Sequence, residues 1–100
     1  MVCMRPVLAM LELDGPTDAL LAAAAKLEAL HATPDGLVAR ILAPTDAGVV
    51  LWQLWATAEA REHNADDPAH GEALRASGLL GLVTGTRARA FEGAALQLFG

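Results

Sequence analysis

The chain has 100 residues, of which 54% are hydrophobic and 19% charged, and its formal net charge at pH 7 is −5. The mean hydropathy is +0.36 and the isoelectric point about 4.9. Because the chain is acidic and has only seven Lys and Arg residues, we expect no nucleic-acid partner. The length fits one domain, residues 1–100, which leaves much of its surface exposed after folding.

No stretch reaches the roughly 20 consecutive apolar residues that a membrane-spanning helix needs. The apolar run near the N-terminus ends at Glu12 and Asp14, and no small-residue cleavage site follows it, so we expect neither a membrane partner nor a signal peptide. Cys3 is the single cysteine and cannot form an internal disulfide, which agrees with a reducing compartment. These features predict a cytoplasmic protein.

The first third of the chain predicts a strand followed by a helix. Residues 5–14 form a short apolar run that ends in acidic residues and a Gly-Pro turn. Residues 16–32 repeat Leu and Ala at three- and four-residue steps, which is typical of an amphipathic helix. We expect Asp14 or Thr17 to cap this helix and the Pro-Asp-Gly of residues 34–36 to end it.

Residues 37–43 and 48–56 predict two strands that a short hairpin connection, PTDAG, joins. The second strand reads GVVLWQLWA, in which only Gln53 interrupts the apolar run. A strand with one face in water alternates apolar and polar residues, so this pattern indicates that both faces are covered.

A second helical region is expected from Thr57 to Gly78, with a break at Pro68 and a restart capped by Asp66 or Asp67. We interpret residues 79–85 as a loop, residues 86–91 as a strand and residues 94–100 as a possible fifth strand.

The resulting order is strand, helix, strand, strand, helix, strand, which predicts an α+β protein with the ferredoxin-like βαββαβ arrangement and an antiparallel sheet. Two helices cover only one face of such a sheet, whereas the strands are apolar on both faces. We therefore expect a homodimer packed sheet to sheet, with twofold symmetry.

Three stretches carry a resemblance to a known family: TPDGLVARIL at 33–42, LWQLWATAEA at 51–60 and HNADDPAH at 63–70. In their order and spacing the chain resembles the antibiotic biosynthesis monooxygenases, small ferredoxin-like proteins of the dimeric α/β-barrel group. The resemblance implies a dimer whose C-terminal strand reaches toward the partner, and a pocket between sheet and helices in each subunit.

The resemblance also implies an activity: cofactor-independent oxidation of aromatic phenols or hydroquinones to quinones. In polyketide-oxidising members a strand Asn acts with a Trp four residues later. Trp55 matches that Trp, and Leu51 occupies the position of the Asn. Relatives with this fold degrade haem, isomerise lactones, cyclise polyketides or only bind ligands. A non-catalytic protein that binds a hydrophobic or aromatic small molecule, or a polyketide cyclase, is therefore the alternative function.

In the oxygenase hypothesis Trp55 orients the ring, Arg87 or Arg89 stabilises a phenolate, and a histidine beside the helix break takes the proton. For each residue a structural role competes: core packing for the Trp residues, a solvated edge strand for the Arg residues, and a polar surface loop for the His residues. We expect His31 to interact with the helix dipole. The candidate catalytic residues are Trp55, His63, His70 and Arg87, and the candidate substrate-binding residues are Trp52, Asn64, Arg40 and Arg89.

The sequence offers no clear place for a metal or a nucleotide cofactor. His63 and His70 are separated by a proline and have no third ligand at diagnostic spacing, and the glycines of residues 78–85 do not follow the dinucleotide-binding pattern. Haem ligation by either histidine stays open on family analogy alone. We expect no cofactor, with molecular oxygen as the only cosubstrate.

Overall fold

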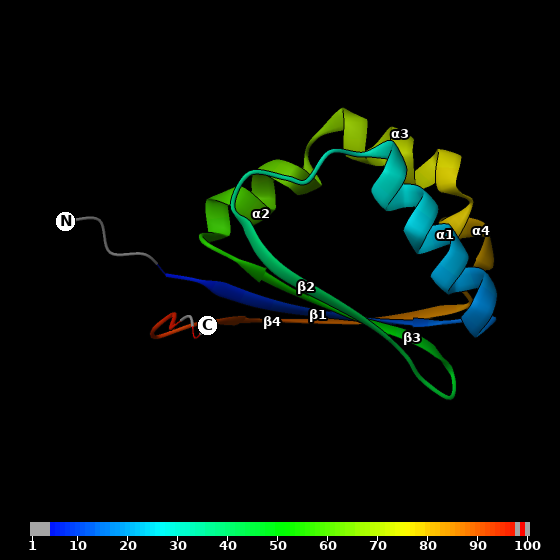
Figure 1. The fold of residues 1–100 in the computed structure, drawn as a ribbon, viewed down its shortest axis with the longest axis horizontal. Helices are drawn as coiled ribbons and strands as arrows, with labels where there is room; N and C mark the ends of the chain where they lie inside the picture. Colours follow the sequence, from blue (N-terminus) through cyan, green and yellow to red (C-terminus); the bar gives the residue numbers. More distant parts are fainter. Residues whose placement is uncertain (1–4, 98, 100) are drawn as a thin grey trace.

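A computed structural model of the chain describes residues 5–97 and 99 and shows one antiparallel sheet with helices on one of its faces (Figure 1). The sheet order is β2-β3-β1-β4, so β2 and β4 are the edges. This arrangement confirms the predicted α+β, ferredoxin-like fold. The elements are β1 (Val7–Asp14), α1 (Thr17–Leu30), β2 (Leu37–Pro44), β3 (Gly48–Trp55), α2 (Ala58–Ala65), α3 (Pro68–Ser77), α4 (Leu79–Leu82) and β4 (Gly85–Glu92).

The start of α1 differs from the prediction. Pro16 occupies the N-cap position and no side chain caps the helix, so the predicted cap at Asp14 or Thr17 is wrong. Asp14 ends β1 and binds Arg87 instead. The Thr17 hydroxyl lies 3.3 Å from the carbonyl oxygen of Thr45 and 3.1 Å from that of Gly48. Thr17 therefore ties the helix start to the β2–β3 hairpin.

The broken second helical region is confirmed. The Thr57 hydroxyl accepts a hydrogen bond from the Ala60 amide at 3.1 Å, and the Asp67 carboxylate accepts one from the Ala69 amide at 3.0 Å. Pro68 stands in the first turn of α3, where it loses no helical hydrogen bond. Gly78 ends α3 with φ of 78°, a left-handed conformation that glycine adopts without steric cost.

Two expectations for the C-terminal third are wrong. Residues 79–85, expected as a loop, begin with the short helix α4, because Leu79 is apolar and packs into the core with 8% of its surface exposed. The possible fifth strand does not form over residues 94–97 or at residue 99, and residues 98 and 100 lie outside the described part.

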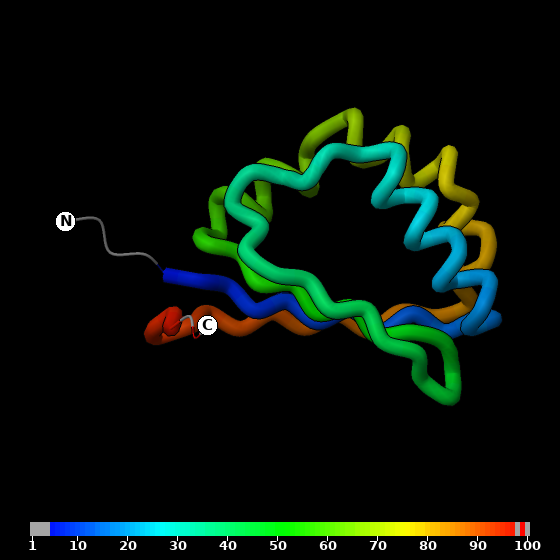
Figure 2. The backbone as a smooth tube through the Cα atoms, in the orientation of Figure 1, coloured from blue at the N-terminus to red at the C-terminus, as the bar shows by residue number. Residues whose placement is uncertain are grey.

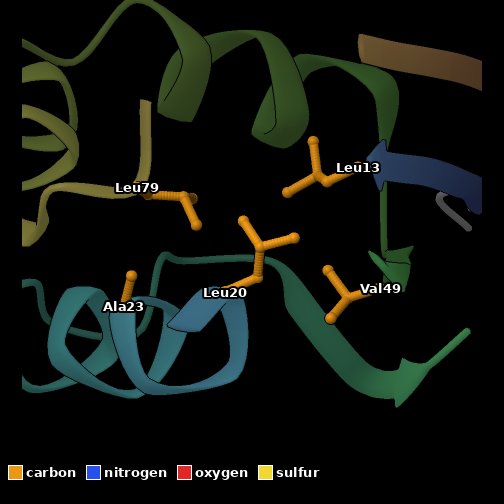
Figure 3. Close-up of a cluster of buried hydrophobic side chains, with 5 residues drawn as sticks. All are labelled: Leu13, Leu20, Ala23, Val49 and Leu79. Atoms are coloured by element: carbon orange, nitrogen blue, oxygen red, sulfur yellow. The ribbon is translucent and has the colours of Figure 1, made fainter. Parts of the chain in front are cut away.

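The core lies between the helices and the inner face of the sheet. Leu20 of α1 is fully buried at the centre of a cluster that joins the sheet to α4 (Figure 3). The backbone trace shows the helical layer arching over this one face (Figure 2). A second cluster, toward the other end of β1, consists of Val7, Ala9 and Trp55. These buried apolar residues of β1, β3 and α1 hold the two layers together.

The opposite, outer face of the sheet has no helix over it (Figure 1). Two rows of side chains cross it: Ile41, Trp52, Met10 and Arg89 in one, and Ala39, Leu54, Leu8 and Phe91 in the other. Ile41 is 63% exposed and Phe91 45% exposed. Both faces of the central strands are therefore apolar, as predicted.

Gly48 begins β3 at a close approach of two backbones. A Cβ atom there would overlap the carbonyl oxygen of Leu13, so Gly48→Ala should lower the free energy of unfolding by about 2 kcal/mol or more. Gly81→Ala is the matched control: nothing lies within 4 Å of its Cβ position, and we expect a change within about 0.5 kcal/mol. Urea unfolding of both variants tests this, and equal midpoints would contradict it.

Candidate functional site

An open cavity of about 200 Å³ lies where α1 ends and the chain turns into β2, against one side of α2. We call it the corner cavity. Its wall carries two imidazoles, an amide, a hydroxyl and two carboxylates, so it suits a ligand with hydrogen-bonding groups. The lining residues are His31, Ala32, Thr33, Pro34, Asp35, Ala60, His63, Asn64 and Asp67.

Three polar residues from three segments meet beside this cavity. The ring of His31, just after α1, lies 5.4 Å from the ring of His70 in α3, centroid to centroid, with the planes tilted by 54°. Nε2 of His31 lies 3.4 Å from Oδ1 of Asn64 in α2, within hydrogen-bonding distance. The predicted residues Asn64, His63 and His70 thus come together in one region.

His70 is held in its neutral form. Burial lowers the pKa of its imidazole below the ordinary value, the neighbouring His31 lowers it further, and Asp67 acts in the opposite direction. Nδ1 of His70 is buried and has no hydrogen-bond partner among the described residues. His70 is not among the residues that line the corner cavity; it lies behind His31, which does line it.

Trp55 lies on the inner face at the end of β3, with 1% of its surface exposed. It forms a buried cluster with Val7 and Ala9, against which Ala60 packs, and Ala60 also lines the corner cavity. Trp55 itself is not among the lining residues. Its indole Nε1 is buried without a hydrogen-bond partner among the described residues, which is costly for an N–H donor.

Arg40 and Leu51 lie on the same inner face, nearer the β2 edge. Arg40 pairs across the sheet with Gln53, and its guanidinium lies 2.7 Å from the carboxylate of Glu28 in α1. Leu51 lies between Leu42 and Leu11 in the neighbouring strands. The position that carries Asn in the polyketide-oxidising proteins is therefore in an apolar stripe.

The remaining predicted residues lie on the outer face and do not share a site with Trp55 and the histidines. Arg87 donates to Glu12 at 2.7 Å and to both oxygens of Asp14 at 3.0 Å. These bonds raise the pKa of Arg87 and lower that of Asp14. The expected grouping of Arg87 with Trp55 and a histidine is thus corrected: strand alternation turns Arg87 to the other side of the sheet.

Arg89 and Trp52 also occupy the outer face. The guanidinium of Arg89 lies 5.2 Å from the ring centre of Phe91, within the range of a cation–π contact. Trp52 lies between Ile41 and Met10 in one of the rows that cross the sheet. Arg89 lies on the edge strand, which agrees with the solvated edge considered for it, whereas Trp52 lies on the uncovered face of the sheet and not in the core.

Sequence reasoning missed His31. The sequence predicts that His31 interacts with the helix dipole. In the structure its ring contacts His70, and its Nε2 reaches Asn64, 33 positions further along the chain. The sequence signal was only its position at the end of an amphipathic helix. Such a position does not reveal which distant residue the side chain meets.

Residues 5–97 and 99 contain no group of three or more His, Cys, Asp or Glu residues placed to hold a metal ion. No helix in this part of the chain is both long enough and apolar enough to cross a membrane.

No protein-family model and no curated protein matches the sequence. Solved structures do match the fold. A candidate antibiotic biosynthesis monooxygenase from Chloroflexus aurantiacus has a TM-score of 0.69 at 12% identity, over 98% of this chain and 100% of that one. A variant of SnoaB, a cofactor-independent oxygenase from Streptomyces nogalater, has a TM-score of 0.68 at 17% identity, over 95% and 97%.

A dimeric ferredoxin-like protein of unknown function from Jannaschia sp. CCS1 is also similar, with a TM-score of 0.64 and 18% identity over 88% of this chain and 99% of that one. At these identities the similarity establishes the fold. The chain has the ferredoxin-like fold of the antibiotic biosynthesis monooxygenases, as the sequence resemblance implied.

Two substitutions of Trp55 distinguish the contribution of its ring packing to stability from the cost of its unpaired indole N–H. Trp55→Phe removes the unpaired donor and keeps most of the ring, so we expect a loss of about 1 kcal/mol or less. Trp55→Ala leaves a cavity and should cost about 3–5 kcal/mol. Denaturant unfolding followed by circular dichroism measures both; similar losses for the two variants would contradict this.

The neutral form of His70 predicts a pH dependence of stability. Because its folded-state pKa lies below 6.5, the unfolded chain binds more protons as the pH falls through that value. The His70 contribution to stability is therefore complete above pH 7.5 and is lost as the pH falls below 6.5. Urea unfolding at pH 7.5 and 5.5 should show a smaller pH effect in His70→Gln than in the native chain; an equal effect in both would refute the prediction.

Proposed function

We propose that the chain is a cofactor-independent oxygenase that converts an aromatic phenol or hydroquinone to a quinone at the corner cavity. The observation that carries the proposal is the neutral His70 beside His31 and Asn64. The shared fold with SnoaB, a cofactor-independent oxygenase, supports the class of reaction.

The proposed residues act on protons and orientation. His31, which lines the cavity and contacts His70, takes the phenolic proton, which makes the ring electron-rich toward O₂. For a phenol, one oxygen atom of O₂ then replaces the hydrogen on a ring carbon as a carbonyl. The other oxygen atom leaves as water with that hydrogen and the phenolic one. A phenol thus supplies the four electrons that O₂ accepts. A hydroquinone supplies two electrons and two protons, and O₂ leaves as hydrogen peroxide, so neither substrate needs a further reductant.

The size of the corner cavity limits how a substrate enters. Ligand pockets usually have volumes of about 300–1,000 Å³, whereas this one has about 200 Å³ and is open to solvent. We infer that the hydroxyl-bearing edge of one ring enters between His63 and Asn64, and that the rest of a larger aromatic system lies outside. Thr33 and Asn64 offer hydrogen bonds to the ring oxygen.

A second candidate function is non-catalytic binding of an aromatic small molecule, or cyclisation of a polyketide. Leu51 favours it, because an apolar side chain at that position neither donates nor accepts a hydrogen bond. The contacts of Arg87 also favour this second function, because its guanidinium is already bonded to two carboxylates on the outer face.

Oxygen uptake with a panel of naphthohydroquinones and anthrones decides between the two functions. As an oxygenase, the chain should consume O₂ above the buffer blank, and His70→Gln should lower the rate about 100-fold, the usual minimum effect of losing a general base. Lys26→Gln, on the exposed side of α1, is the control and should keep full activity. Uptake equal to the blank together with ligand-induced quenching of Trp fluorescence would establish the second function instead.

We also propose that two copies pack through the outer sheet face as a homodimer. The chain exposes 6702 Å², compared with about 5,400 Å² expected for a folded monomer of its mass. The apolar rows on the outer face account for part of this excess. The similar protein from Jannaschia is described as dimeric, which supports the proposal.

A charged side chain introduced in the middle of the outer sheet face tests whether two copies associate through it. Ile41→Glu places two carboxylates in a symmetric interface, one from each copy, and should weaken association at least about 100-fold. Leu80→Glu is the matched control, because Leu80 is 59% exposed, similar to Ile41 at 63%, but lies on α4. Sedimentation equilibrium should give a monomer for the first variant and a dimer for the second; a native chain with the mass of one copy would refute the proposal.

A further inference from the structure

The contact between His31 and His70 joins two helix ends that are distant in the sequence. His31 follows the last residue of α1, and its amide donates to the carbonyl oxygen of Leu27 at 3.1 Å, which holds its backbone in place. His70 lies in the first turn of α3. The ring centroids of the two imidazoles are 5.4 Å apart, and Nδ1 of His70 is buried.

We propose that His31 and His70 form a proton-sensitive latch. When at most one of the two imidazoles is charged, the pair holds the start of α3 against the end of α1. When both are charged, the two rings repel each other and the corner cavity opens. This inference goes beyond the proposed oxygenase reaction. It requires the two helix ends and the cavity, and no substrate.

The charges around the pair can compensate one proton but not two. Asp67, at the N-cap of α3, attracts a charge on His70, but its carboxylate also accepts the Ala69 amide hydrogen bond. Asn64 of α2 meets His31 with a neutral amide oxygen. Asp35 and His63 lie on the other walls of the cavity. Two imidazolium rings in contact therefore repel each other, and among the described residues Asp67 is the carboxylate that favours a charge on His70.

The fold confines the movement that this repulsion causes to the start of α3. Its C-terminal end is anchored: Ala73 and Ser77 are buried, and the Ser77 hydroxyl donates to the Leu74 carbonyl at 2.7 Å and accepts from the Leu79 amide at 3.2 Å. Its N-terminal end follows the joint before Pro68, where Asp67 has an extended backbone with ψ of 119°. The Asp67 amide donates to the Asn64 carbonyl oxygen at 3.2 Å, which ties this joint to α2. Repulsion at His70 thus acts on the end of α3 that lacks buried side chains.

Histidine titration of the whole chain by NMR tests the coupling without any substrate. The native His70 imidazole should titrate at a lower pH than an isolated histidine, and its curve should respond to the titration of His31. In His31→Gln and in His31→Phe the His70 midpoint should move up toward the ordinary value, because both variants remove the neighbouring charge. His31→Phe keeps a ring against His70, so it separates charge from packing. His63→Gln, in the same cavity but outside the pair, is the matched control and should leave the midpoint unchanged.

Hydrogen exchange tests the opening itself. After correction for the intrinsic pH effect, amides of residues 70–72 in the native chain should exchange about tenfold faster at pH 5 than at pH 7.5, and those of residues 76–79 should not. His31→Phe should abolish the difference.

A His70 midpoint that is the same with and without His31, or exchange at residues 70–72 that is independent of pH, would overturn the latch. If both His31 variants fail to fold, the native titration and exchange decide alone. A chain that consumes no oxygen but shows these results would have the latch without the oxygenase function.

Discussion

The structure depends on a mismatch between a sheet that is apolar on both faces and a helical layer that covers only one. Leu20, Val49 and Trp55 on the covered side have at most 1% of their surface exposed. On the other side Ile41 and Phe91 are 63% and 45% exposed. Burial of apolar surface is the main driving force of folding, so the inner face stabilises the monomer while the outer face remains available to a second surface.

The same mismatch determines where the charged groups lie. The ion pairs of Arg87 with Glu12 and Asp14 lie beside the apolar rows of the outer face, on the edge strand β4. Exposed ion pairs contribute little to stability, typically 0–1 kcal/mol. Their effect here is better described as protecting a strand edge from unspecific pairing.

The chemically interesting groups gather at the ends of helices, away from the middle of the sheet. Leu51 lies in an apolar stripe of the sheet, and the indole N–H of Trp55 is buried without a hydrogen-bond partner among the described residues. His31, Asn64 and His70 instead come from the end of α1, from α2 and from the start of α3. Helix ends move more easily than strands, so a site built there can couple proton uptake to opening.

The sequence alone determined the features that depend on neighbouring residues: the β2–β3 hairpin, the helix break at Pro68 with a cap at Asp66 or Asp67, the Gly78 stop and the ferredoxin-like order of elements. These depend on turn chemistry and side-chain periodicity, which act over a few residues. Because His63, Asn64 and His70 lie close together in the sequence beside the helix break, the sequence alone also predicts that they share one region. Only the tertiary structure decided which face of the sheet Arg87 occupies, that residues 79–82 form a helix against the core, and that His31 meets His70. Strand alternation places Arg87 and Arg89 on one face but does not say which face the helices cover, and a contact between distant residues exists only when the whole chain has packed.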